Sequence, residues 1–247
     1  MIYRFDTVTS TNDVAREPQY LHGDIVAAEF QTAGRGQRGH TWTSSAGLNL
    51  MFTAVLCPTF LPVHEQFLLS ECVALALCDT FASFGIATRI KWTNDIYAGD
   101  RKLAGVLIEQ NVTGTSISRS IIGIGINVNQ TEFDPSLPNP VSMKQLTGST
   151  FDRDVILERF SRCLMSRYGQ MESGDRRQLQ EEYRQSMYRL GEMSPFRLVP
   201  SGEVITAEIA GVQPSGALIL RSADGRQDEY RFREVEFIVG KDCRFEK

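Results

Sequence analysis

The stretch IKWTNDIYAGDRKLAGVLIE, residues 90–109, places charged side chains at the ends of two apolar segments. Residues 96–109 have the pattern of a β-hairpin whose turn is AGDR, and residues 88–92 predict the strand that precedes it. A lysine at the end of a buried strand, such as Lys91 or Lys102, is placed to neutralise an anion within an apolar site. The stretch therefore predicts sheet structure that carries an anion-binding site.

Outward from this hairpin, the chain alternates apolar strands with helices. The expected strands cover residues 2–5, 25–30, 48–56 and 121–128, and the expected helices begin at 10–12 and cover 67–84, 152–171 and 176–190. After residue 191 the pattern changes to short alternating strands around 196–199, 205–212, 217–221 and 229–233. We expect an α+β fold, with a mixed-sheet catalytic domain over residues 1–190 and a small SH3-like β-barrel domain over 191–247.

Composition points to an ordinary soluble, cytoplasmic protein. The 247 residues carry a net charge of −4, which argues against broad binding to nucleic acid. The five cysteines have no metal-ligand spacing and are expected to be reduced thiols. The N-terminus lacks a secretory signal pattern, and the most apolar window, residues 67–84, is interrupted by Glu71 and Asp79, so we expect no membrane partner.

A second polar stretch, QTAGRGQRGHTW at residues 31–42, lies between two predicted strands. Its glycines leave backbone amides bare, and Arg35 and Arg38 supply positive charge, as an oxyanion site requires. Taken alone, such a loop is more often a solvated turn, and a lone lysine is more often a surface residue. The sequence contains no Walker A motif, no GxGxxG at the start of a helix and no GxSxG nucleophile motif. Any phosphate-binding site in this chain is therefore not of the P-loop or dinucleotide-binding type.

Taken together, the motifs carry more information than any one of them. In order along the chain they are STN at 10–12, QTAGRGQRGHTW at 31–42, KWTND at 91–95, GDRKLAGVLIE at 99–109 and GIGINVN at 123–129. This set resembles the biotin–protein ligases, or biotin–[acetyl-CoA-carboxylase] ligases, over the first 190 or so residues. The resemblance implies the class II synthetase/biotin–lipoate ligase type of mixed sheet.

The resemblance also implies an activity. Such enzymes use ATP and Mg²⁺ to activate biotin as biotinoyl-5′-AMP, with release of pyrophosphate. They then transfer the biotinoyl group to one lysine of a biotin carboxyl carrier protein or domain. Cations that offset the repulsion between the biotin carboxylate and the α-phosphate would lower the barrier of the first step.

The resemblance assigns roles by position. The implied catalytic residues are Lys102, Arg38 and Asp95, with Asp95 also the candidate ligand for Mg²⁺. The implied biotin-binding residues are Ser10, Thr11, Asn12, Gln31, Arg35, Gly36, Gln37, Lys102 and Gly105, and Gly123 would let the ligand lie against backbone. The implied ATP-binding residues are Arg35, Arg38, Trp42, Lys91, Asn94 and Asn127.

The sequence departs from the family pattern at two positions. Thr93 stands where proline is commoner, and Gln37 stands where many members have arginine. Gln37 removes one charge from the predicted phosphate loop, so we expect binding through amide hydrogen bonds and a change in how long the adenylate is retained.

Three other interpretations stay open. A lipoate–protein ligase or octanoyltransferase shares the fold but usually carries an RRxxGGG-type loop. A DNA-binding repressor would need a helix-turn-helix before residue 2, so we expect the form without a DNA-binding domain and no DNA partner. A catalytically silent biotin-binding regulator is the non-enzymatic alternative. A homodimer is compatible with the sequence if the β-branched strand at 121–128 forms an edge.

Overall fold

Alternate residues of the central strands face opposite sides of one sheet. The computed structural model describes residues 1–36 and 41–239. On the strand β7 (Ser116–Ile126), Ile122, Ile124 and Ile126 belong to the main core. Ile121 belongs to a separate small cluster on the other side of the sheet, and Gly123 and Gly125 follow it with the same period of two. One face of the sheet is therefore filled with apolar side chains, and the opposite face is left bare in the middle.

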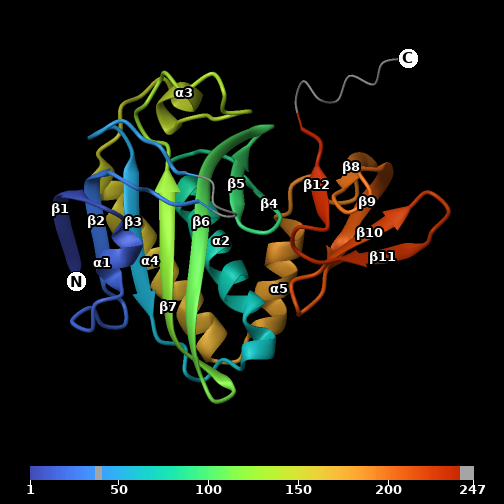
Figure 1. The fold of residues 1–247 in the computed structure, drawn as a ribbon, viewed down its shortest axis with the longest axis horizontal. Coiled ribbons are helices and arrows are strands. Elements are labelled where there is room, and N and C mark those ends of the chain that lie inside the picture. Colours follow the sequence, from blue (N-terminus) through green and yellow to red (C-terminus); the bar gives the residue numbers. More distant parts are fainter. Residues whose placement is uncertain (37–40, 240–247) are drawn as a thin grey trace.

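The sheet has seven strands in the order β1-β2-β3-β7-β6-β5-β4 (Figure 1). Only β1 and β2 pair in parallel, and every other neighbouring pair is antiparallel. Besides β7, the strands are β1 (Ile2–Val8), β2 (Ile25–Gln31), β3 (Leu50–Leu56), β4 (Arg89–Lys91), β5 (Asp95–Ala98) and β6 (Arg101–Thr113). The β5–β6 hairpin is the one predicted from sequence, and Gly99 adopts a φ of 56° in its turn.

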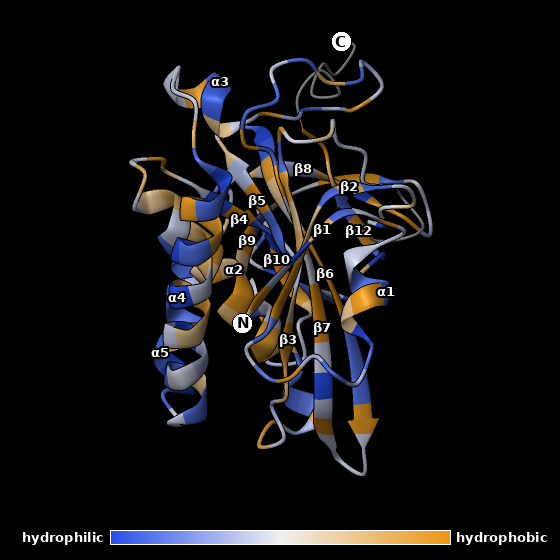
Figure 2. Cartoon of the chain, turned by 90° about the vertical axis from the view of Figure 1, so that its left-hand side faces the viewer, coloured by the Kyte–Doolittle hydropathy of each residue, from blue (hydrophilic) through white to orange (hydrophobic). Residues whose placement is uncertain are grey.

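Helices cover the filled face of the sheet. The long helices are α2 (Phe67–Ala82), α4 (Arg153–Glu172) and α5 (Arg176–Gln185), and α2 is apolar on nearly every side because α4, α5 and the sheet surround it. The short helix α1 (Thr11–Ala15) lies on the opposite face, as Figure 2 shows. A 3₁₀ turn (Val63–Glu65) precedes α2, and α3 (Met143–Thr147) follows the proline-rich loop.

A second, five-stranded antiparallel sheet follows the helices, in the order β11-β10-β9-β8-β12. Its strands are β8 (Ser194–Leu198), β9 (Val204–Val212), β10 (Leu218–Ser222), β11 (Gln227–Tyr230) and β12 (Val235–Phe237). The α+β class and the appended small sheet agree with the sequence-based expectation.

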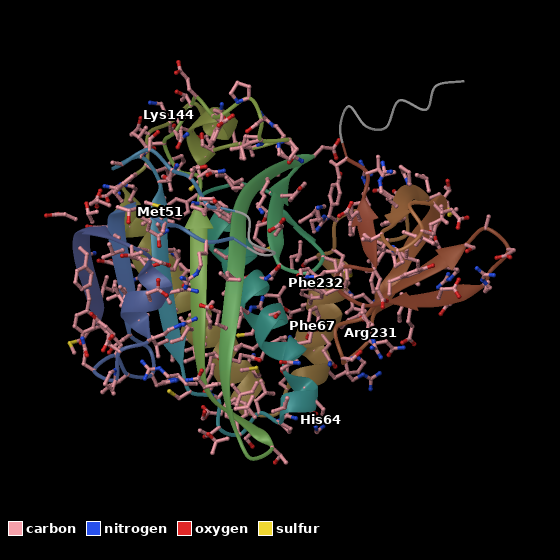
Figure 3. The ribbon with its side chains drawn as sticks, viewed as in Figure 1. Met51, His64, Phe67, Lys144, Arg231 and Phe232 are labelled. Atoms are coloured by element: carbon pink, nitrogen blue, oxygen red, sulfur yellow. The ribbon has the colours of Figure 1, made fainter. Side chains whose placement is uncertain are left out.

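Aromatic side chains join the two sheets. The indole nitrogen of Trp92 donates to the carbonyl oxygen of Gly216 at 3.0 Å, and its ring meets that of Phe232 edge-on at 6.2 Å between centroids. A β-carbon at Gly216 would lie 2.6 Å from the ring of Phe67, so the turn of the small sheet sits directly on α2. Phe67 and Phe232 are labelled at this boundary in Figure 3. The KWTND motif therefore helps to fix the position of the C-terminal sheet.

Several sequence-based expectations need correction. β7 lies between β3 and β6, so residues 121–128 are not an edge through which two copies could pair. The last helix ends at Gln185 rather than at residue 190, and α3 and β12 were missed because each has five residues or fewer. Ser10 occupies the N-cap position of α1 with an extended backbone, but its hydroxyl makes no capping hydrogen bond with a described residue.

Two composition-based expectations can also be compared with the structure. The described cysteines, Cys57, Cys72, Cys78 and Cys163, are free thiols, whereas Cys243 lies outside the described residues. Within residues 1–36 and 41–239, no helix combines the length and the apolar character that crossing a bilayer requires.

Glu71 in α2 is a buried acid that yields a test of the fold. Its side chain is 4% exposed, and no group in the described part of the chain hydrogen-bonds to Oε2. Burial raises the pKa of Glu71 to about 8 from an ordinary value of 4.5. The unfolded chain therefore ionises first as pH rises, and the free energy of unfolding should fall by a few kcal/mol between these two values.

Replacement Glu71→Gln should remove most of that loss. We expect the variant to gain thermal stability over the parent at pH 8 and to differ little from it near pH 4.5, as measured by calorimetry. Glu158→Gln, the same change at an exposed position of α4, is the matched control and should leave the pH profile unaltered. A parent whose stability does not decline over this pH range would contradict the assignment.

Candidate functional site

The predicted motifs meet at a cavity of about 480 Å³ on the bare face of the sheet. It lies between α1, the loop after β2, the central strands β6 and β7, and the C-terminal sheet. The predicted residues that line it are Ser10, Thr11, Asn12, Gln31, Arg35, Gly36, Trp42, Lys91, Asn94, Asp95, Lys102, Gly105 and Gly123. Segments spread over more than 110 positions of sequence thus contribute to a single site.

The other three predicted residues are not among the described residues that line the cavity. Gln37 and Arg38 lie outside the described residues. Asn127 is buried behind the described lining of the cavity, where its amide nitrogen lies 3.4 Å from the carbonyl oxygen of Lys102. Its predicted contact with adenosine stays a prediction, and the contact seen here is with the strand that carries Lys102.

The floor of the cavity is bare backbone. A β-carbon at Gly125 would lie 2.2 Å from the indole of Trp42, and one at Gly123 would lie 2.3 Å from Oδ1 of Asn12. On the neighbouring strand, a β-carbon at Gly105 would lie 3.2 Å from both Nζ of Lys102 and the Trp42 ring. Real β-carbons do not approach such atoms closer than about 3 Å, so glycine at 123 and 125 is what allows Asn12 and Trp42 to lie against the sheet, and a side chain at 105 would be tight.

The start of α1 forms a hydrogen-bonded corner at one end of the cavity. Both the backbone nitrogen and the hydroxyl of Thr11 lie within reach of Oε1 of Gln31, at 2.7 and 3.1 Å. The buried Thr53 hydroxyl lies 2.6 Å from Oδ1 of Asn12 and 2.8 Å from the hydroxyl of Thr11. Because Oε1 of Gln31 is engaged, its amide nitrogen is the group left to donate to a ligand. That nitrogen lies next to Gly34, 3.0 Å from where a β-carbon would be.

Lys102 and Asp95 form the ionic centre of the cavity. Nζ of Lys102 lies 2.8 Å from Oδ1 of Asp95, and both side chains are about one-third exposed, at 33% and 27%. An ammonium group has three donors, so one bond to Asp95 leaves two for the oxygens of an anionic ligand. A partly exposed ion pair contributes little to stability, about 1 kcal/mol or less. The ion pair instead fixes the position of the Lys102 ammonium group in the cavity.

Lys91 lies at the boundary between the two sheets. Its Nζ is 5.3 Å from the ring centroid of Tyr97 and 5.2 Å from that of Phe237, within the range of cation–π attraction. The cavity wall on this side comes from the C-terminal sheet, through Phe232, Val235, Glu236 and Phe237. Sequence reasoning did not identify these residues, because nothing in their local pattern differs from that of an ordinary barrel strand.

Asn94 supports the wall of the cavity from within. Its amide nitrogen donates to the carbonyl oxygen of Val106 at 2.9 Å, and its Oδ1 accepts from the hydroxyl of Thr93 at 2.7 Å. The Tyr183 hydroxyl donates to the carbonyl oxygen of Thr93 at 2.7 Å. The bond that starts this turn, Trp92–Thr93, is a cis peptide. Asn94 is therefore at the cavity, as predicted, with part of its hydrogen-bonding capacity used to hold the KWTND turn on β6.

Arg35 lines the cavity, but its charge is already partnered. Both of its terminal nitrogens donate to the carboxylate of Asp13, at 2.9 and 2.7 Å, and one lies 3.7 Å from Glu109. The hydrogen bond from Arg35 holds the pKa of Asp13 below its ordinary value. The pair joins the loop of the predicted anion site to α1, an arrangement that the sequence motif did not suggest.

The cavity suits Mg²⁺ only with help from a ligand. Nowhere in residues 1–36 and 41–239 do three or more acidic, histidine or cysteine side chains gather in a way that could hold a metal ion. Asp95 is one carboxylate facing the cavity, and Mg²⁺ is commonly held by one or two carboxylates together with substrate phosphates. The residues therefore fit a Mg²⁺ ion that arrives with a nucleotide.

A cavity with a polar corner at one end, a lysine at its centre and glycine backbone along its floor is suited to an anionic small molecule. Residues 2–127 match the biotin/lipoate A/B protein ligase family. The biotin–[acetyl-CoA-carboxylase] ligase of Paracoccus denitrificans is 33% identical over 235 residues, covering 92% of this chain and 95% of that protein. The chain belongs to the biotin/lipoate A/B protein ligase family.

Two further relatives agree with this placement. The bifunctional ligase/repressor BirA of Bacillus spizizenii is 29% identical over 237 residues, covering 93% of this chain and 72% of that protein. Among solved structures, the biotin protein ligase of Aquifex aeolicus in complex with biotin and ATP superposes with a TM-score of 0.81 at 25% identity, covering 97% of this chain and 99% of the other.

The glycine floor can be tested without any ligand. Gly125→Ala would force the Trp42 indole off the sheet, and overpacking of this kind costs about 1–3 kcal/mol of stability. Because the chain has only two tryptophans, and Trp92 is buried against Gly216 and Phe232, tryptophan fluorescence should report the displacement of Trp42. We expect a changed emission spectrum and a lower midpoint of unfolding.

Gly169→Ala is the matched control, since a β-carbon there meets nothing within 4 Å and the site is in α4. That variant should keep the parent spectrum and should be as stable as the parent or slightly more so. Identical spectra for Gly125→Ala and the parent would show that Trp42 does not rest on Gly125.

Proposed function

We propose that the chain is an ATP-dependent biotin–protein ligase. It activates biotin as biotinoyl-5′-AMP and transfers the biotinoyl group to a lysine of a biotin carboxyl carrier domain. The observation that supports this most strongly is the ion pair between Lys102 and Asp95. It lies in the same cavity as the polar corner formed by Thr11, Asn12 and Gln31. The family match and the 33% identity with a biotin–[acetyl-CoA-carboxylase] ligase support the same conclusion.

The polar corner suits the fused rings of biotin. The ureido group has one carbonyl acceptor and two N–H donors, and the corner offers amide and hydroxyl groups of both kinds from Ser10, Asn12 and Gln31. In this arrangement the amide nitrogen of Gln31 donates to the ureido oxygen, because its Oε1 is held by Thr11. The rings then lie beside Asn12 near the backbone of Gly123, and the valeryl chain extends toward Lys102.

In the first step, an oxygen of the biotin carboxylate attacks the α-phosphorus of ATP. The bond from that phosphorus to the bridging oxygen breaks, and pyrophosphate leaves with the electron pair. Two donors of the Lys102 ammonium group face the carboxylate and the α-phosphate, while the third stays on Asp95. Lys102 thereby offsets the repulsion between the reacting anions and fixes their approach. Lys91 neutralises the phosphates from the side of the C-terminal sheet.

In the second step, the amine of the acceptor lysine attacks the carbonyl carbon of the adenylate, and AMP leaves with the electrons of the acyl–oxygen bond. The amine loses a proton in this step, and the carboxylate of Asp95, which faces the cavity, accepts it. Asp95 would hold Mg²⁺ together with the phosphates of the nucleotide, and the ion would supply further charge neutralisation. We propose Trp42 for the adenosine side, since its indole nitrogen is buried and has no hydrogen-bond partner among the described residues.

The wider assignment follows from the same proposal. The chain divides into a catalytic domain at residues 1–190 and an SH3-like domain at 191–247, a division supported by the two separate sheets. The acceptor is a biotin-dependent carboxylase, the location is cytoplasmic, and neither DNA nor a membrane is a partner. A homodimer stays a prediction, and it would have to use a surface other than β7.

The activity can be tested with purified components. Incubation with labelled biotin, ATP, Mg²⁺ and an apo carrier domain should place label on one carrier lysine, and omission of ATP should prevent it. Parallel reactions with lipoate and octanoate address the related activities of the same fold. Transfer of lipoate or octanoate without transfer of biotin would overturn the proposal.

The role of Lys102 has its own test. Lys102→Ala should lower the rate of adenylate formation by about 10²–10³-fold or more, the size of effect expected when a charge-stabilising donor is lost. Pyrophosphate exchange measures this step without the carrier. Lys144→Ala, in α3 and not among the residues that line the cavity, is the control and should retain the parent rate. Normal exchange by Lys102→Ala, with an unchanged fold, would exclude the proposed role.

A further inference from the structure

Glu109 lies on β6, seven residues after Lys102 and on the face of the sheet that carries α1. It is not among the residues that line the main cavity, and its side chain is 31% exposed. An acid in such a place would ordinarily be a surface residue of a strand. Its contacts set it apart, because both of its carboxylate oxygens are bound by groups that belong to the polar corner or adjoin it.

The first contact is with the amide of Asn12. Nδ2 of Asn12 donates to Oε2 of Glu109 at 2.8 Å, while Oδ1 of Asn12 accepts from the Thr53 hydroxyl at 2.6 Å. A flipped amide would direct Oδ1 at the carboxylate, which repels it, and would turn Nδ2 away from its acceptor. Glu109 and Thr53 together therefore determine which way the Asn12 amide points.

The second contact of Glu109 is with arginine side chains and fixes the end of α1. Arg16, just after α1, donates to Oε1 of Glu109 at 2.6 Å. Arg35, on the loop after β2, lies 3.7 Å from Oε2 and is held twice by Asp13. The charges of two carboxylates, Asp13 and Glu109, and two guanidinium groups, Arg16 and Arg35, thus cancel within one cluster. The cluster joins three segments of chain: α1, the start of the 31–42 loop, and β6.

Rigidity at this corner matters because α1 itself has only five residues. A helix that short is not stable alone, so its orientation depends on tertiary contacts. Asn12 lies 3 % exposed between Glu109, Thr53 and the bare backbone at Gly123. Glu109 supplies the only charged hydrogen-bond partner of this amide among the contacts described, and charge-assisted bonds are roughly twice as strong as neutral ones.

We propose that Glu109 is a positioning residue for biotin: it does not touch the ligand, and it holds the Asn12 amide and the start of the arginine loop in the orientation that binds the ureido end. This inference rests on the proposed function. It separates biotin recognition, which depends on Glu109, from the chemistry at Lys102 and Asp95, which does not.

Biotin affinity in the absence of ATP is the measurement that tests this role. Isothermal titration calorimetry should show biotin binding about ten-fold weaker for Glu109→Ala, the equivalent of one charge-assisted hydrogen bond. Glu109→Gln keeps an oxygen that can accept from Asn12 and should weaken binding only about two- to three-fold. In steady-state assays the KM for biotin should rise, while kcat at saturating biotin and the KM for ATP stay within about two-fold of the parent.

Glu181 provides a matched control. It also accepts from one arginine and one side-chain amide, Arg184 and Gln185, but it lies exposed on α5. Glu181→Ala should leave biotin affinity unchanged. A merely structural role for Glu109 would instead lower kcat and raise the KM for both biotin and ATP, in step with a loss of thermal stability.

A double-mutant cycle identifies the route of the effect. If Glu109 acts through Asn12, Glu109→Ala should cost much less in an Asn12→Ala background than in the parent. Unchanged biotin affinity in Glu109→Ala, or fully additive losses in the cycle, would overturn the inference. If the parent binds biotin but does not form the adenylate, the proposed function fails while this positioning role can still be measured. A parent that binds no biotin contradicts both.

Discussion

Bare backbone on one face of β6 and β7 is the constraint on which the site depends. Side chains alternate along a strand, so the core-facing positions of β7 can be isoleucine while the positions between them are glycine. A methyl group at Gly123 or Gly125 would collide with Asn12 or Trp42. The same strands thus provide a packed core on one side and, on the other, backbone without side chains on which Asn12 and Trp42 rest beside the cavity.

The polar groups of the site lie on or beside this glycine backbone. Lys102 and Asp95 lie on the hairpin next to β7 and hold each other at hydrogen-bond distance. Asn12 reaches the glycine backbone from α1, and Trp42 reaches it from the loop after β2. The C-terminal sheet closes the remaining side because Trp92, one residue from Lys91, is bonded to its turn at Gly216. The KWTND motif therefore supplies two charged residues of the cavity, Lys91 and Asp95, and also the contact with the C-terminal sheet.

The sequence alone predicted most of the strands, helices and cavity residues. It did not predict the contacts between side chains that are far apart in the sequence, and the reason is physical. The hairpin, the apolar helix α2 and the alternating glycines follow from periodicity, which is a local property. The motifs predicted which residues would meet at the cavity. They did not predict that Arg35 would be neutralised by Asp13, or that Glu109 would hold Asn12, because these pairs join residues whose distance in space depends on the whole sheet. Nor did any local signal single out Phe237, whose ring faces Lys91 only after the two sheets have docked.

The central claim is that biotin and the α-phosphate of ATP meet at Lys102 beside this glycine backbone. A crystal structure of the chain with a non-hydrolysable biotinoyl-adenylate analogue tests it most directly. We predict that Nζ of Lys102 will bind oxygens of both the acyl and phosphate groups while keeping Asp95, with the ureido ring beside Asn12 and Gln31 near the backbone of Gly123. An analogue bound elsewhere, or bound in the cavity with Lys102 contacting Asp95 alone, would contradict the account.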